Sequence, residues 1–274
     1  MISPSSCAPA GGPPLRGPRG NWFNGDQDPV SSASDHRSLR VRRVVAEAIG
    51  TFFLVLIGPG SAMVNASSDG SLGHVGVALA FAFVVVGMIY ALGHLSGAHI
   101  NPAVTLAFWS VRRFPTAEVI PYMLAQCAGA VAASLALRAA LGSVGNMGAT
   151  LPAIPVGAAF CVEWLLSFAL MFVIMAVATD ERVADGFAPL AVGLTVGFCA
   201  LMGGPLTGAS MNPARSFGPS LVGGYWTAHW LYWVSPISAM IVAARTYDLL
   251  RSAQPPRSTS RPVGVQGPIH DRAE

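Results

Sequence analysis

Residues 96–103 read Ser-Gly-Ala-His-Ile-Asn-Pro-Ala, and residues 207–214 read Thr-Gly-Ala-Ser-Met-Asn-Pro-Ala. Asparagine is a strong helix N-cap, and proline is favoured at the first helical position, where its missing N–H is not needed. Each loop is therefore predicted to start a short helix, over residues 102–110 and about 213–222. Both would be too short to cross a membrane, which takes about 20 apolar residues. One Asn-Pro-Ala is typical of an ordinary turn, whereas two matched copies indicate a repeat.

The likeness between the two halves extends beyond these loops. Residues 46–54 read Ala-Glu-Ala-Ile-Gly-Thr-Phe-Phe-Leu, and residues 162–170 read Val-Glu-Trp-Leu-Leu-Ser-Phe-Ala-Leu. Glu47 and Glu163 therefore occupy matching positions, each well before an Asn-Pro-Ala loop. We predict two copies of one structural unit, over residues 41–141 and 156–247.

The composition around the repeat is that of a membrane protein. Hydrophobic residues make up 53% of the 274 and charged residues only 11%, with a mean hydropathy of +0.54. A soluble domain carries about 25% charged residues, so a soluble α/β enzyme is excluded. The apolar runs are long and lack the period-two alternation of a membrane β-barrel, which indicates helices. Small residues such as Gly193 and Gly197 recur within the runs, as is typical of closely packed membrane helices.

Six stretches are predicted to span the bilayer. They cover approximately residues 44–64, 75–95, 119–141, 156–178, 187–203 and 226–244. Each copy of the repeat holds three spans, and because three is odd the second copy must be inserted upside down. Inverted repeats place a functional site at the bilayer midplane, where discontinuous helices meet.

Arginines predict the orientation, with both termini in the cytoplasm. They flank the ends of the spans that would face this side: Arg37, Arg40, Arg42, Arg43, Arg112, Arg113, Arg182, Arg245 and Arg251. The formal net charge of +3 comes largely from these flanks and does not indicate nucleic-acid binding. Residues 1–40 and 248–274 lack an apolar core and are predicted to be disordered tails, without a signal peptide.

The predicted short helices suit a pore that rejects ions. Their N-termini would meet at the membrane centre, and each carries about half a positive charge, which opposes cations and hydronium. The side-chain amides of Asn101 and Asn212 could each donate to a water oxygen. A water held by two donors cannot easily relay a proton along a file of waters.

With these motifs the chain resembles the aquaporin (major intrinsic protein) family over roughly residues 42–247, and its loops resemble the plant nodulin-like branch and its bacterial relatives. The resemblance implies an all-α membrane protein, an aquaporin-like hourglass bundle of six transmembrane helices plus two re-entrant half-helices from an inverted repeat. It implies a passive channel with no enzymatic activity, in the plasma membrane, with water and small neutral solutes as its cargo. A homotetramer with one pore per subunit is implied too. The four cysteines show no metal or disulfide spacing, and no cofactor or metal is expected.

The resemblance also assigns roles to individual residues. The pore motifs are Asn101, Pro102, Ala103, Asn212, Pro213 and Ala214, the selectivity constriction is Phe81, Ala200, Ala209 and Arg215, and the loop supports are Glu47, Glu163, His94 and His99. Water-selective members carry histidine at the position of Ala200, so the small alanine predicts a wider and more apolar aperture. Glycerol, urea or metalloid acids such as arsenous acid are then expected to pass. Ser216, where glycerol facilitators have aspartate, and Tyr232-Trp233 favour the alternative of a strictly water-selective channel.

Two other functional classes share some of these features. An ion-coupled secondary transporter also uses inverted repeats and broken helices, and either membrane glutamate could couple protons. The symmetric placement of Glu47 and Glu163 favours structural support instead. An intramembrane hydrolase could be built on Ser61 within Gly-Pro-Gly-Ser, but glycine and proline at a helix end explain that segment more simply.

Overall fold

The computed structural model describes residues 33–180 and 186–252, and every regular element in them is helical. The elements are α1 Ala33–Ser67, α2 Gly73–Ser96, α3 Pro102–Ser110, α4 Thr116–Leu141, the short turn η1 Val144–Gly148, α5 Val156–Thr179, α6 Ala188–Thr207, α7 Pro213–Gly223 and α8 Leu231–Ser252. Within these ranges there is no strand, which confirms the predicted all-α fold.

Five helices of the described part are long and apolar enough to cross a membrane, namely α1, α2, α4, α5 and α6. Helix α8 takes the place of the sixth predicted span, but its last turns carry Arg245, Asp248 and Arg251, which lower its hydropathy. The helix begins at Leu231 and not at residue 226, because residues 227–230 form turns.

Three sequence-based boundaries need correction. Helix α1 begins at Ala33, within the predicted tail, and α8 continues to Ser252, past residue 247. Hydropathy marks where a helix leaves the membrane, whereas backbone hydrogen bonding can continue into polar residues. The segment around Pro59 lies inside α1 and not at a helix end. The rest of the two predicted tails and Arg182 lie outside the described residues.

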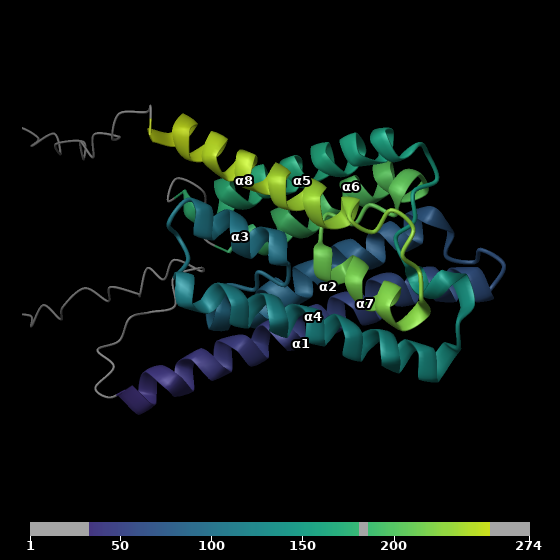
Figure 1. Cartoon of the computed structure of the whole chain (residues 1–274), viewed down its shortest axis with the longest axis horizontal. Helices are drawn as coiled ribbons and strands as arrows, with labels where there is room; N and C mark the ends of the chain where they lie inside the picture. The colour runs from purple at the N-terminus through teal and green to yellow at the C-terminus, as the bar shows by residue number, and fades with distance from the viewer. Residues whose placement is uncertain (1–32, 181–185, 253–274) are drawn as a thin grey trace, which may run out of the picture.

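The two halves of the bundle are built alike. Helix α1 packs against α2 and α4, and α5 packs in the same way against α6 and α8. The halves join where α2 packs against α6. The short helices cross over, because α3 packs against α8 and α7 against α4. Figure 1 shows α3 toward one end of the bundle and α7 toward the other, with the start of α1 and the end of α8 at the same end.

Small residues allow the central helices to approach closely. A Cβ added to Gly193 of α6 would lie 2.8 Å from the Ala82 carbonyl oxygen of α2, and one added to Gly129 of α4 would lie 2.1 Å from the Ala48 oxygen of α1. Neither position can hold a side chain without separating the helices. The predicted packing role of Gly193 therefore operates at the seam between the two halves.

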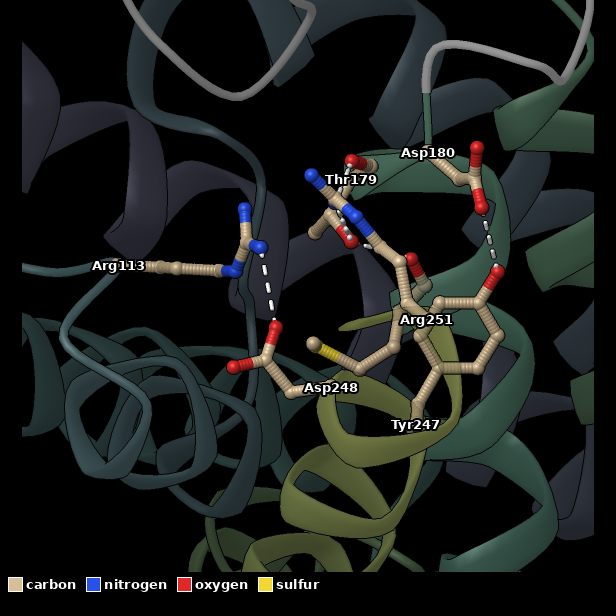
Figure 2. A network of polar contacts seen from close by, with 7 residues as sticks. Arg113, Thr179, Asp180, Tyr247, Asp248 and Arg251 are labelled. Carbon is tan, nitrogen blue, oxygen red and sulfur yellow. Dashed lines mark hydrogen bonds and ion pairs between the residues drawn. The ribbon is translucent and has the colours of Figure 1, made fainter. Parts of the chain in front are cut away.

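Polar contacts tie together the end of the bundle at which α1 begins and α8 ends (Figure 2). Arg113, in the α3–α4 loop, pairs with Asp248 of α8 at 3.1 Å. The Tyr247 hydroxyl donates to Asp180 at 3.0 Å, and Arg251 donates to the Thr179 carbonyl. The first contact holds the polar last turns of α8 against the α3–α4 loop, and the other two hold them against the end of α5.

Candidate functional site

The two Asn-Pro-Ala motifs start helices, as their chemistry requires. Helix α3 begins at Pro102, and the Asn101 side-chain oxygen accepts from the Ala103 N–H at 2.9 Å. Helix α7 begins at Pro213, and the Asn212 oxygen accepts from the Ala214 N–H at 3.0 Å. Each asparagine thus caps its own short helix. Both helices end within one residue of the predicted positions.

The same asparagines bind the two loops to each other. The Asn101 Nδ2 donates to the Met211 carbonyl at 2.8 Å, and the Asn212 Nδ2 donates to the Ile100 carbonyl at 2.8 Å. The N-termini of α3 and α7 therefore meet in the middle of the bundle. An amide group has two hydrogens, so each Nδ2 keeps one N–H beyond its cross-loop bond.

Both loops hold non-glycine residues in a left-handed backbone conformation. Their φ angles are +43° at Ala98, +41° at Ile100, +43° at Ala209 and +51° at Met211. Such angles are uncommon outside glycine, and for a β-branched residue such as Ile100 they are an outlier. A conformation of this kind persists only where its surroundings enforce it.

Two buried glutamates enforce the loop conformation. The Glu47 carboxyl group accepts from the His99 N–H at 2.9 Å and the Ile100 N–H at 2.6 Å. In the other half, Glu163 accepts from the Ser210 N–H at 2.8 Å and the Met211 N–H at 2.9 Å. Neither glutamate is exposed at all. Their acceptor oxygens are committed to the loops, an arrangement that does not suit a proton-coupling site.

Further residues, for which the sequence predicted no such role, also hold the loops. The Tyr122 hydroxyl donates to the last carbonyl of α2, at Ser96, over 2.9 Å, and the Tyr232 hydroxyl donates to the last carbonyl of α6, at Thr207, over 2.7 Å. Gln126 donates to Glu47 at 2.8 Å. The two tyrosines are partners in the repeat, and aligning the halves helix by helix would have matched them.

Of the two histidines that flank the first loop, the structure brings only one to it. The His99 ring is buried, lies 3.1 Å from the Thr105 hydroxyl and stacks on Phe108 with 5.0 Å between centroids. His94 is exposed on α2, and its ring makes no hydrogen bond to any residue in 33–180 or 186–252. Its predicted part in holding the loop has no contact to support it.

The four predicted constriction residues line one cavity, together with both motif asparagines. Phe81 comes from α2, Ala200 from α6, Ala209 from the second loop and Arg215 from α7. The remaining lining is mostly apolar: Leu54, Val85, Ile89, Ala98, His99, Ile100, Val104, Leu170, Ile174, Val192, Val196, Ser210 and Met211.

Arg215 is the charged side chain of this lining, and it is held on two sides. Its guanidinium carbon lies 5.0 Å from the centroid of the Phe81 ring, within cation–π range. Its Nη1 donates to the Gly148 carbonyl of η1 at 2.7 Å. The buried Nε has no protein partner among the described residues. A solute oxygen in the cavity could accept from this side chain.

The Phe81 ring packs against α1 at Gly58. A Cβ added to Gly58 would lie 2.2, 2.6 and 2.6 Å from three atoms of the Phe81 ring. The ring therefore occupies the space that any side chain at residue 58 would fill. In the sequence Gly58 is part of a Gly-Pro-Gly-Ser segment, and nothing local to that segment reveals the ring beside it.

Known proteins share this chain's sequence and its fold. A family model described as major intrinsic protein matches residues 34–247. Aquaporin NIP1-1 from Oryza sativa subsp. japonica is 42% identical over 217 residues, which are 79% of this chain and 76% of that protein. Nodulin-26 from Glycine max is 42% identical over 221 residues, 80% of this chain and 81% of that protein. The X-ray structure of the aquaglyceroporin from Plasmodium falciparum superposes with a TM-score of 0.68 at 27% identity, covering 76% of this chain and 96% of that one.

Proposed function

This chain belongs to the major intrinsic protein family and is a multi-pass membrane channel for water and small solutes, and we propose that these cross through the cavity between α3 and α7. It is a channel and not an enzyme. The observation that carries the proposed route is the meeting of two capped helix N-termini beside a cavity lined by both motif asparagines. The paired Asn-Pro-Ala motifs of the sequence predict the same route.

Ion exclusion follows from the charges around this route. Each of the two helix N-termini carries about half a positive charge, and Arg215 adds a full one. A cation or hydronium at the centre would face all three. We propose that the second N–H of Asn101 and of Asn212 donates to a passing water, so that the water cannot accept from its neighbours and relay a proton.

We propose that Phe81, Ala200, Ala209 and Arg215 form the selectivity constriction. Two of these four walls are alanines, which leave room for a solute larger than water. Selectivity of this kind depends on pore width and on the donors that line it. A neutral polyol such as glycerol, urea, or an undissociated acid such as arsenous acid could slide along the Phe81 ring and accept from Arg215. The glutamates Glu47 and Glu163, with His99, would keep the loops in register.

The assembly and orientation are part of the same proposal. We propose a homotetramer in the plasma membrane, with one pore per subunit and both termini in the cytoplasm. The start of α1 and the end of α8 lie at one end of the bundle (Figure 1), in line with an even number of crossings. The arginines that flank α1, the α3–α4 loop and α8 favour the cytoplasm for this end.

Stopped-flow light scattering on vesicles that contain the purified protein tests the proposal. Sucrose gradients report water flux, and glycerol and urea gradients report solute flux. We expect faster water flux than in empty vesicles, and glycerol or urea flux at a measurable fraction of it. Water flux without any solute flux would establish the strictly water-selective alternative, which Ser216 favours. No flux of either kind would contradict the proposed route.

A further inference from the structure

Helix α6 contains a proline near its last turn, and this proline frees one carbonyl group. Pro205 has no N–H, so the carbonyl of Leu201, four residues earlier, cannot receive the usual helical hydrogen bond from that position. Leu201 directly follows Ala200, one of the proposed constriction residues. The Leu201 side chain is exposed, so the freed carbonyl belongs to the outer side of the helix that carries Ala200.

A histidine from the other half of the chain reaches this carbonyl. His74, the second residue of α2, places its Nε2 2.8 Å from the Leu201 oxygen, across 127 residues of sequence. A carbonyl oxygen only accepts, so Nε2 donates. The bond replaces the one that Pro205 removes.

The neighbouring glycine makes room for the histidine. A Cβ added to Gly204 would lie 2.6 Å from Cε1 of the His74 ring, closer than real Cβ contacts allow. Three residues thus act together. Pro205 lacks the N–H that would bond the Leu201 carbonyl, and Gly204 has no side chain in the space beside it. The His74 ring fills that space and donates to the carbonyl. Chance surface contact does not require the first two features.

The turn that His74 contacts supports two walls of the constriction. Ala200 lines the cavity directly. A Cβ on Gly203 would lie 3.4 Å from the Ala209 Cβ, so this part of α6 also lies behind Ala209. Helices bend most readily at proline, where a backbone hydrogen bond is missing. A donor placed on the freed carbonyl opposes that bending.

We infer that His74 is a positioning residue of the selectivity constriction, which caps the carbonyl freed by Pro205 and thereby fixes the α6 turn that carries Ala200. The inference rests on the proposed constriction. Without the cap, the α6 wall yields more easily to a solute larger than water. The ratio of glycerol to water permeability then rises, because water already fits.

The test compares two replacements of similar length in reconstituted vesicles. His74→Gln keeps an N–H donor and His74→Met does not. Loss of one hydrogen bond, roughly 1 kcal/mol, corresponds to about a fivefold change in an equilibrium, so His74→Met should raise the glycerol-to-water ratio by about two- to fivefold. His74→Gln should leave the ratio near that of the wild type. His94→Ala, at the exposed histidine of the same helix, is the matched control and should change nothing.

A second pair tests whether Pro205 is the reason. Pro205→Ala restores a backbone N–H to the Leu201 carbonyl, so His74→Met should have no effect on the ratio in that background. The inference is overturned if the Met and Gln variants behave alike, or if the Met effect persists with Pro205→Ala. Ala200→His separates this failure from a failure of the proposed function. If that change lowers glycerol flux while His74→Met does nothing, the constriction stands and the role of His74 does not.

Discussion

Replacing Gly58 by alanine should push the Phe81 ring into the cavity and so narrow the pore. The new Cβ would lie 2.2 Å from the nearest Phe81 ring atom, and carbon atoms attract at roughly 3.5 Å, so that atom must move by about 1.3 Å. The ring is rigid and cannot yield at a flexible end. The open direction is the cavity, which Phe81 lines and where the Arg215 guanidinium carbon lies 5.0 Å from the ring centroid.

The expected size of the effect follows from the strain of overpacking. For glycerol to pass, the ring must press back against α1, and overpacking of this kind costs about 1–3 kcal/mol. At about 1.4 kcal/mol per factor of ten, we expect Gly58→Ala to lower glycerol permeability about fivefold to hundredfold. Water needs less width, so its permeability should fall less.

Light scattering with glycerol and sucrose gradients gives both permeabilities from one preparation. Gly87 lies on the same helix as Phe81, and a Cβ added there would meet no atom within 4 Å. Gly87→Ala is therefore the matched control. The double variant Gly58→Ala/Phe81→Ala should regain glycerol flux, since the displaced ring is gone. Glycerol flux at the wild-type rate in Gly58→Ala, with the protein intact, would refute the reasoning.

Three other predictions concern charge, support and orientation. Arg215→Val should raise glycerol flux and admit a proton leak measurable with a pH-sensitive dye in the vesicles, and an unchanged proton barrier would show that Arg215 is not needed for exclusion. Glu47→Ala leaves the loop N–H groups that it binds without a partner, at roughly 1–3 kcal/mol for each, so a lower melting temperature in detergent is expected, and unaltered melting would contradict the support role. Cysteines introduced at Ser68 and at Ser258, the latter outside the described residues, should react with an impermeant maleimide from opposite sides of the membrane, whereas labelling from the same side would exclude the proposed orientation.

Local chemistry made much of this architecture predictable. Asn-Pro fixes a helix start within a few residues, so the beginnings of α3 and α7 could be read from the sequence. Glu47 and Glu163 could be paired because the two copies of the repeat have similar sequences around them. Membrane spans could be located because a helix in lipid needs a long apolar run.

The contacts that shape the pore were not predictable in this way. Three such contacts join segments that are far apart in the chain: the packing of Phe81 on Gly58, the hydrogen bond from Arg215 to Gly148, and the contact of His74 with α6. They depend on how two helices are rotated against each other, which no local pattern records. His94 shows the converse: its nearness to the loop in sequence suggested a contact, but its place on α2 leaves the ring exposed.

The glycerol permeability of Ala200→His, measured beside the wild type in the same vesicles, tests the central claim most directly. Histidine adds bulk and a polar group to one of the two small walls of the proposed constriction. Wild-type protein should conduct glycerol, and Ala200→His should suppress that flux while keeping much of the water flux, because water still fits and gains a partner. Equal glycerol flux in the two proteins, or none in the wild type, would contradict a solute route past Ala200.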